Sequence, residues 1–519
     1  MVRLKIFLGI IFMAYGITAN AAVYYVDQTA GSDGNNGTSP GTPWKNCPGM
    51  AAYTGGGRLA AGDTVYFDKG DVWSVSNGTQ GILLVGGVTY DGETWGAGGT
   101  RAEIRAAGNQ ESGMVRFRDH VTVATVFKGF VVNANHTVST GVDINHAHYI
   151  VMSGATKRVQ NCEVKNVSSR TSNGEYKYGI IASNHGGKDG YTENVEILNC
   201  VVHDISRDGI CLYPGDENAD CRIRNITVRG CESYNAGQDP EYGAGHGIVI
   251  KGYVVDAFVE YNYVHDNIGA GIFINGNERN HYPGIGISNA HIRYNIVNNN
   301  TMHGGIRIYD GSGGDPKDLR IYGNVVMNNT INGGLSLDSA KGPLSLLVYN
   351  NTFYNTFVHY RKYTATITTS EFRNNIVHYT GGTPFIAESG AVTVHSNNIY
   401  SGGIGALVTI GTTSYSSGDL GSYEPTASAA DPLFRNTGNL PTGFLGAYGN
   451  DLAPNLDGLS LQQRSGGVDR GVILGYPYNG SINSRNRPSG NGWDIGAYEF
   501  NPGQTQNRIP NPPSNVRVL

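Results

Sequence analysis

The sequence predicts an all-β solenoid, a fold in which short strands stack coil upon coil along one axis. Three observations predict it: a phrase that recurs with a drifting period, apolar residues that alternate with period two inside it, and no helical stripe. The phrase runs from Asn-Cys or Tyr-Asn through an apolar pair and an Asn or Asp to Gly-Ile-x-Ile-x. Equivalent residues are 38, 31, 31, 33, 29, 27 and 24 positions apart, in the column Cys162, Cys200, Cys231, Asn262, Asn295, Asn324, Asn351 and Asn375.

The repeat is clear over residues 161–380, and we expect one β-solenoid domain over residues 22–500 because each coil buries its apolar face against its neighbours. Residues 23–60 read as an N-terminal cap, and GDTVYFDKGDVW reads as a strand, a turn and a second strand. Residues 381–500 are rich in Gly, Ser and Thr, and we expect an irregular C-terminal closing segment there.

The two ends of the chain carry different signals. Arg3 and Lys5 precede an apolar run and an Ala-Asn-Ala site, so residues 1–21 read as a signal peptide of a secreted or cell-surface protein. The apolar run is too short to span a bilayer, and we expect no transmembrane segment. Residues 501–519 are rich in Pro and Asn and read as a flexible tail.

Charge excludes some partners. The net charge is -5 and only 15% of the residues are charged, so no basic block is available to neutralise nucleic acid phosphates. A local group of Lys and Arg could still hold an acidic polysaccharide, and the 32 Tyr against 15 Phe suit a sugar-binding surface. We expect a monomer with an acidic polysaccharide as its partner.

The cysteines fit an oxidising compartment but do not require disulfides. Cys162, Cys200 and Cys231 share one column, where we favour an unbridged stack because asparagines continue it. Cys211 and Cys221 flank a loop and are the better candidates for a disulfide.

Within the repeat, the strand after each Gly alternates between two faces. We expect the pairs Ile210/Leu212, Ile248/Ile250, Ile272/Ile274 and Ile306/Ile308 to fill the core and the intervening residues to face solvent. A second column should turn the corners, since Asn and Asp tolerate left-handed backbone: Asn166, Asp204, Asn235, Asp266, Asn299, Asn328 and Asn355.

The coil length, the stacked Ile pairs and the Asn column resemble the right-handed parallel β-helix of the pectin-lyase-like superfamily. The opening YYVDQTAGSDGNNGTSPGTPW and the closing VDRG and RNRPSGNGWDIGAYEF also resemble the ends of secreted bacterial β-helix proteins. The resemblance covers about residues 22–500 and implies the fold; the group includes lyases, hydrolases, epimerases and non-catalytic adhesins, so it does not imply one activity.

Candidate site residues lie on the outward face of consecutive coils. Tyr213, Lys251, Asn275 and Tyr309 form a predicted substrate-binding column with neighbours about 4.8 Å apart, close to the repeat of a sugar unit. Other polar residues lie at or near the starts of the same strands: Asp208, His246, His303 and Arg307.

The leading hypothesis is a lyase that cleaves a uronic acid polysaccharide by β-elimination, which needs a base, a cation for the carboxylate and an acid. Lys251 or His246 would be the base, Arg307 would pair with the carboxylate, and Tyr309 or Tyr213 would be the acid. Many β-helix lyases use Ca²⁺ instead. The acidic loop Asp216, Glu217 and Asp220 could bind Ca²⁺, although its spacing fits no standard calcium loop.

Resemblances to two enzyme groups implicate Asp208. Asp208-Gly209 followed by Lys251 is similar to calcium-dependent pectate lyases, with Cys211 where a further Asp ligand is expected. Gly245-His246-Gly247, Asp208 and Arg307 resemble polygalacturonases, with Arg207 in place of the paired carboxylate and Tyr309 in place of Lys.

The alternatives are therefore a glycoside hydrolase, a uronan C5-epimerase, which shares proton abstraction at C5, and a non-catalytic glycan-binding or structural rod.

Overall fold

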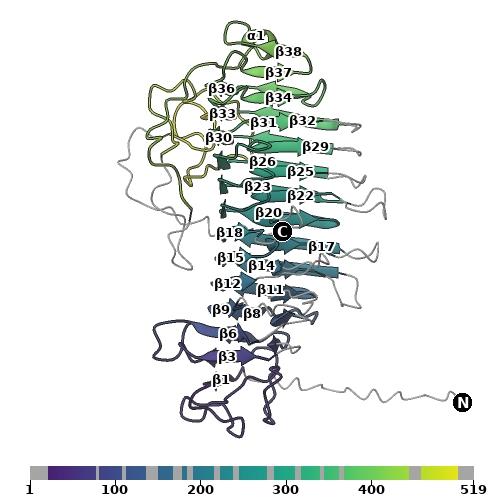
Figure 1. The fold of residues 1–519 in the computed structure, drawn as a ribbon, viewed down its shortest axis with the longest axis vertical. Coiled ribbons are helices and arrows are strands. Elements are labelled where there is room, and N and C mark those ends of the chain that lie inside the picture. Colours follow the sequence, from purple (N-terminus) through teal and green to yellow (C-terminus); the bar gives the residue numbers. More distant parts are fainter. Residues whose placement is uncertain are drawn as a thin grey trace, which may run out of the picture.

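The computed structural model describes residues 21–76, 81–107, 113–117, 119–135, 150–167, 178–183, 191–214, 222–237, 245–276, 286–309, 317–338, 344–361, 367–443 and 458–500. Its strands form three long sheets that share one axis, with β1 near the purple end and β38 and α1 at the green end in Figure 1. All strand pairs except β37–β38 are parallel, and each strand pairs with its equivalent in the next coil. The described residues thus form a parallel β-helix.

The three sheets, which we name A, B and C, are composed as follows. Sheet A contains β1 (Val23–Val26), β2 (Thr64–Phe67), β5 (Thr89–Asp91), β8 (Thr125–Lys128), β11 (Ala155–Gln160), β14 (Tyr191–Leu198), β17 (Arg222–Arg229), β20 (Val254–Glu260), β23 (Ser288–Arg293), β26 (Lys317–Tyr322), β29 (Leu344–Tyr349), β32 (Ile367–Arg373) and β35 (Val394–Ser396). Sheet B contains β4 (Ile82–Leu83), β7 (Val115–Phe117), β10 (Ile150–Met152), β13 (Tyr178–Ala182), β16 (Asp208–Leu212), β19 (Ile248–Lys251), β22 (Ile272–Asn275), β25 (Ile306–Tyr309), β28 (Leu335–Asp338), β31 (Val358–Tyr360), β34 (Phe385–Ala387), β37 (Val408–Ile410) and β38 (Thr413–Tyr415). Sheet C contains β3 (Val72–Val75), β6 (Ala102–Ala106), β9 (Phe130–Asn133), β12 (Glu163–Val167), β15 (Val201–Ile205), β18 (Glu232–Ala236), β21 (Tyr263–His265), β24 (Ile296–Asn298), β27 (Val325–Met327), β30 (Thr352–Tyr354), β33 (Ile376–His378) and β36 (Ile399–Ser401).

The core lies inside the three sheets and is filled by the predicted inward residues. Both members of each predicted Ile and Leu pair of β16, β19, β22 and β25 are 0% exposed. Each buried side chain of this size contributes about 1.5–3 kcal/mol to folding. The strand, turn and strand predicted within GDTVYFDKGDVW correspond to β2 and β3.

A ladder of buried asparagine side chains runs along the axis between sheets A and C. In Asn295, Nδ2 donates to Oδ1 of Asn324 at 2.9 Å and to the carbonyl oxygen of Val259 at 2.9 Å, while its backbone N–H also donates to Asn324 Oδ1. The same pattern repeats at each coil from Asn262 to Asn398. This asparagine ladder ends on the buried carboxylate of Glu424, which accepts from Asn398.

A second asparagine column, absent from our sequence predictions, lies between sheets C and B. Asn267 Nδ2 donates to Asn300 Oδ1 at 2.9 Å, and Asn300 Nδ2 donates to Asn329 Oδ1 at 3.2 Å. This column lies against the Gly that precedes β19, β22 and β25: a Cβ at Gly271 would lie 2.5 Å from Val297 Cγ1 and 2.7 Å from Asn300 Nδ2. An Asn or Asp directly before each of these asparagines was the signal that could have revealed the column.

The predicted corner column is confirmed. Its members have backbone φ angles between 50° and 61°, in the left-handed region where Asn and Asp are tolerated best: Asn166, Asp204, Asn235, Asp266, Asn299, Asn328 and Asn355.

The predicted cysteine stack is also confirmed. Cys162, Cys200 and Cys231 are free and fully buried, and Cys231 N–H donates to Asn262 Oδ1, which joins the stack to the asparagine ladder. The favoured disulfide was wrong, because Cys211 is a free, buried thiol on sheet B; Cys221 lies outside the described residues.

The chain closes the solenoid and then turns back. Helix α1 (Leu420–Tyr423) lies beyond the last coil, and residues 458–500, which we call the C-terminal segment, pack on the outside of earlier coils. Figure 1 shows this segment in yellow beside β30, β33 and β36. Asparagines at the corners hold it: Asn374 Nδ2 donates to the Val472 carbonyl at 2.8 Å, and Asn397 Nδ2 donates to that of Arg470 at 2.8 Å.

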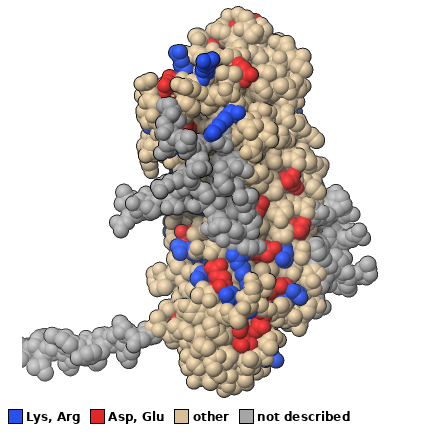
Figure 2. Space-filling view, turned by 90° about the vertical axis from the view of Figure 1, so that its left-hand side faces the viewer, with Lys and Arg blue, Asp and Glu red and all other residues tan. Residues whose placement is uncertain are grey.

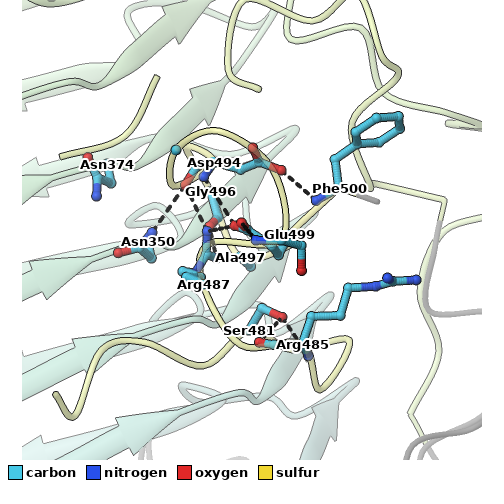
Figure 3. Close-up of polar contacts among 12 residues, drawn as sticks. Asn350, Asn374, Ser481, Arg485, Arg487, Asp494, Gly496, Ala497, Glu499 and Phe500 are labelled. Atoms are coloured by element: carbon cyan, nitrogen blue, oxygen red, sulfur yellow. Dashed lines mark hydrogen bonds and ion pairs between the residues drawn. The ribbon is translucent and has the colours of Figure 1, made fainter. Parts of the chain in front are cut away.

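A buried ion pair organises the C-terminal segment (Figure 3). The Arg487 side chain donates to Glu499 Oε2 at 2.8 Å and to the carbonyls of Asp494 and Gly496 at 2.8 and 2.7 Å. Both ion-paired side chains are 0% exposed. Burial and the neighbouring Glu499 charge raise the pKa of Asp494 to about 7.

Residues 1–20 of the predicted signal peptide, which was expected to end at residue 21, and the whole predicted tail, residues 501–519, lie outside the described residues. Among the described residues, no helix has the length and apolar character needed to cross a membrane.

Replacing one member of the asparagine ladder should destabilise the whole solenoid. We expect Asn324→Ala to lower the free energy of unfolding by about 2–4 kcal/mol, since it leaves several buried backbone and amide groups without partners. Chemical denaturation measures this. Asn299→Gly, an exposed corner residue replaced without loss of left-handed freedom, is the control and should cost less than about 1 kcal/mol.

The C-terminal segment should be less stable at higher pH. The folded-state pKa of Asp494 lies above its ordinary value of 3.8, so its stabilising contribution is full below pH 3.8 and is lost as pH rises through about 7. Hydrogen exchange of this segment between pH 4 and 8 measures the effect. Asp494→Asn should flatten the profile and Asp431→Asn, an exposed control, should not; an unchanged slope in Asp494→Asn would contradict the assignment.

Candidate functional site

The outward face of sheet B carries two columns of side chains that the strand register aligns. One column is Val249, Phe273, Arg307, Ser336 and His359, and the other is Lys251, Asn275, Tyr309 and Asp338. The register confirms the predicted alignment of Lys251, Asn275 and Tyr309 on consecutive strands. Tyr213, which follows β16, joins the second column, because Lys251 Nζ lies 4.5 Å from the centre of its ring.

The prediction that this face is open to solvent was wrong at several positions. Cys211, Val249 and Asn275 are 1–2% exposed, Lys251 is 4% exposed and Tyr213 is 6% exposed. These side chains cover one another, since in-register neighbours on adjacent strands lie within contact distance. Tyr178, Ile181, Cys211, Tyr213 and Val249 form an apolar patch outside the core, with Phe273 packed against it. Burial raises the pKa of the Cys211 thiol, which makes it a poor nucleophile.

The predicted site residues form two groups along the strands. Asp208, His246, His303 and Arg307, which we call the histidine cluster, lie where the strands begin. Tyr213, Lys251 and Asn275, which we call the lysine cluster, lie where the strands end. Lys251 lies five positions after His246, so their Cα atoms are up to about 16 Å apart. The structure thus separates Lys251 from His246, the two residues that we had treated as alternative candidates for the base.

Asp208 anchors the loop that carries His246. Its Oδ1 accepts the backbone N–H groups of Gly245 at 3.1 Å and His246 at 2.8 Å, and its Oδ2 lies 3.5 Å from Arg207 Nε. Asp208 is 3% exposed. The Asp208 carboxylate therefore holds the backbone of the loop and pairs with the Arg207 guanidinium.

The His246 ring is fixed on two sides. Its Nδ1 accepts the backbone N–H of Ala270 at 2.8 Å, and the ring stacks on Phe273 with centres 4.2 Å apart. Burial lowers the pKa of His246 to about 4; Asp208 acts in the opposite sense, and the charges of His303, Arg207 and Arg307 lower it further. The imidazole is therefore neutral at neutral pH.

Arg307 is held by two polar side chains and two aromatic rings. Its Nη2 donates to Asp338 Oδ2 at 2.5 Å and its Nη1 donates to His303 Nδ1 at 2.5 Å. The guanidinium also lies over the rings of Phe273 at 5.9 Å and Tyr309 at 5.3 Å. Arg307 Nε has no hydrogen-bond partner among the described residues, nor has Asn275 Oδ1.

Sequence reasoning gave no role to Phe273 or Asp338. Both stand at outward positions of the aligned strands Gly271-IFIN and Gly334-LSLD, so the pattern places them on this face. Their contacts with His246 and Arg307 depend on side-chain positions, which a repeat does not specify.

Sheet C carries a polar strip whose charges are satisfied internally. Tyr234 is stacked between His203 and His265, with centres 4.8 and 5.0 Å away. His203 contacts Glu163 at 3.1 Å and Asp204 at 2.8 Å. Burial lowers its pKa, but these two carboxylates outweigh burial and raise it. Figure 2 likewise shows acidic and basic residues side by side, rather than grouped by sign, on the face that it presents.

The N-terminal cap contains a group of three carboxylates and a cavity beside Asp33. Carboxylate oxygens of Asp27, Asp68 and Asp71 lie within 4.8 Å of one another, an arrangement that a cation such as Ca²⁺ can accept. Backbone N–H groups already bond two of these carboxylates. A cavity of about 740 Å³ lies near Asp33 and Trp44, and Asp33 is bonded to Asn46 and Thr54. The acidic loop at Asp216, Glu217 and Asp220 lies outside the described residues.

Comparison with known families supports the fold. The family described as "Right handed beta helix region" matches residues 129–353. A search of curated proteins finds no significant match.

Several solved structures are similar at low identity. Pectate lyase Pel9A is 14% identical, with 92% of this chain and 96% of that chain covered and a TM-score of 0.45. A lacto-N-biosidase from Eubacterium ramulus is 14% identical, with coverage of 79% and 68% and a TM-score of 0.43. The A-module of the mannuronan C-5 epimerase AlgE4 from Azotobacter vinelandii is 12% identical, with coverage of 71% and 91% and a TM-score of 0.40.

With the three parallel sheets, the family match shows that this chain is a right-handed parallel β-helix.

His246 should titrate far below an ordinary histidine. Its folded-state pKa of about 4 lies below the ordinary 6.5, so the stability contributed by the neutral ring is full above pH 6.5 and is lost as pH falls through about 4. Ring ¹⁵N shifts followed by NMR between pH 3 and 8 measure this. Phe273→Ala, which uncovers the ring, should move the titration toward 6.5; a wild-type midpoint near 6.5 would show that the ring is solvated.

Proposed function

We propose that this protein acts outside the cytoplasm on an acidic polysaccharide and cleaves it by β-elimination next to a uronic acid. The observation that supports this most directly is the alignment of Lys251, Asn275 and Tyr309 in one column, with Arg307 in the adjacent column. Successive strands place a cation or hydrogen-bonding group about every 4.8 Å along the axis, a spacing that suits an extended glycan.

Lys251 is the base in this proposal. The other candidate, His246, has the lone pair of Nδ1 occupied by the Ala270 N–H, so the neutral ring carries its proton on Nε2 and offers no lone pair. Lys251 lies against the Tyr213 ring at a buried position from which water is largely excluded. Proton abstraction at C5 by a positioned amine contributes about 10²–10⁴-fold to the rate.

Arg307 pairs with the substrate carboxylate and stabilises the charge that develops on it as the C5 proton leaves. Asp338 and His303 hold two of its nitrogens, and two aromatic rings hold its plane, so little ordering is required when substrate binds. Tyr309, whose ring lies under this guanidinium, is placed to protonate the leaving oxygen; Tyr213 beside Lys251 is the alternative acid.

Glycoside hydrolysis is less well supported. It needs two carboxylates that flank one bond. Asp208 is bonded to two backbone N–H groups, and Asp338 lies 2.5 Å from Arg307 and 3.7 Å from Arg361. Both carboxylates therefore already hold protein groups.

The lyase hypothesis predicts a rise in ultraviolet absorbance from the unsaturated uronic product. Purified protein would be screened against pectate, alginate, hyaluronan and bacterial exopolysaccharides, with Ca²⁺ and with chelator. Lys251→Ala should lower kcat/KM by about 10²–10⁴-fold and Arg307→Ala by about 10²–10³-fold.

Matched controls are Lys165→Ala on sheet C and Arg158→Ala on sheet A, both ion-paired residues away from this face. Full activity of Lys251→Ala would exclude it as the base. Reducing ends without unsaturated product would indicate a hydrolase, inverted C5 centres an epimerase, and binding without any product a non-catalytic protein.

A further inference from the structure

His246 is held more tightly than a packing residue requires. Its backbone N–H donates to Asp208 at 2.8 Å, its Nδ1 accepts from Ala270 at 2.8 Å, and its ring is stacked at 14° on Phe273. The residue is 6% exposed. Position, ring plane and ring orientation are thus all fixed by separate contacts.

The contact with Ala270 also fixes where the ring proton sits. A backbone N–H can only donate, so Nδ1 must be the unprotonated nitrogen. The neutral ring then carries its hydrogen on Nε2, and this N–H makes no hydrogen bond with any residue that the structure describes. Although the residue is only 6% exposed, Nε2 is not among the buried side-chain atoms that lack a partner, so this donor is accessible and a ligand acceptor can reach it.

The surroundings of the ring offer a second donor to such an acceptor, because Arg307 Nε has no hydrogen-bond partner among the described residues. The His303 ring lies 5.7 Å from that of His246 and accepts from the Arg307 guanidinium. Arg207 Nε lies 3.5 Å from Oδ2 of Asp208, the residue that holds the backbone of His246. Arg207 and Arg307 are positive, while Asp208 and Asp338 oppose them and are each engaged with an arginine.

We propose that His246 binds substrate, donating a hydrogen bond from Nε2–H to an anionic oxygen of the glycan, a carboxylate or a sulfate, beside Arg307. The inference rests on the proposed function in taking the ligand to be an acidic glycan, but it does not require elimination. It makes His246 a selector of acidic over neutral sugars, because a fixed donor beside Arg307 forms a stronger hydrogen bond with an anionic acceptor than with a neutral one.

A pair of substitutions separates this role from a structural one. In His246→Gln the side-chain amide can place an N–H near the Nε2 position, and the acceptor for Ala270 is lost. In His246→Asn the side-chain oxygen can replace Nδ1 as acceptor, and the outer donor is lost. A binding role therefore predicts that Gln is the better substitute, and a structural role predicts that Asn is.

The experiment is calorimetric titration in a Lys251→Ala background, so that no turnover occurs. The probes are an oligogalacturonate, its neutral methyl ester and a sulfated neutral oligosaccharide, of which the first and third distinguish carboxylate from sulfate. We expect His246→Asn to weaken binding of one acidic probe by about tenfold or more and to leave the methyl ester unchanged, with His246→Gln within about threefold. His378→Gln, on sheet C, is the matched control.

Equal binding by His246→Asn and the parent, or no binding of either acidic probe by the parent, would overturn the inference. If a variant does not fold, ¹⁵N NMR of the parent protein decides: the His246 Nε2–H resonance should shift on adding the acidic probe and not on adding the methyl ester. Binding that follows this pattern, while the protein with Lys251 intact forms no unsaturated product from the same probe, would refute the lyase and retain the inference.

Discussion

The buried asparagine ladder is the interaction on which the rest of this solenoid depends. Each amide nitrogen donates to the asparagine of the next coil and to a backbone carbonyl of the preceding coil, and each amide oxygen accepts from the asparagine of the preceding coil. All these groups are shielded from water, where an unmet hydrogen bond costs about 1–3 kcal/mol. A coil that slipped by one residue would break this chain and turn its side chains to the opposite face. The ladder therefore fixes the register of the coils from Asn262 to Asn398, and Glu424 provides the acceptor at which it can end.

Fixed register is what turns a repeat into a candidate site. Lys251, Asn275 and Tyr309 lie in one column because the strands that carry them pair residue for residue. The glycine at the start of each of these strands allows the second asparagine column to approach the backbone, so sequence features inside the solenoid control the geometry outside it. This fixed alignment suits the glycan-binding surface that we propose.

On the outward face of sheet B, polar residues are arranged so that each has a defined task. Asp208 holds the loop of His246, and Asp338 holds Arg307. Burial and nearby cations keep His246 neutral, and the Ala270 N–H selects its tautomer. A proton acceptor and a proton donor are thus separated along the strands: Lys251 at one end is suited to remove a proton, and His246 at the other is suited to bind an oxygen.

The amino-acid sequence determined the fold, because period-two alternation and a column of Asn at coil-length spacing are satisfied together only when strands stack in parallel coils. It also determined which residues point outward and which corner residues take the left-handed backbone. It did not determine how outward side chains cover one another, so Lys251 and Asn275 were expected at the surface and are buried.

Nor did it separate His246 from Lys251, since position in a repeat gives the strand and the face but not the contacts of the side chain. Those contacts arise between coils 24 to 38 residues apart, as between Ala270 and His246 or between Asp338 and Arg307. Only the tertiary structure decided them, because each depends on which rotamers the neighbouring coils leave room for.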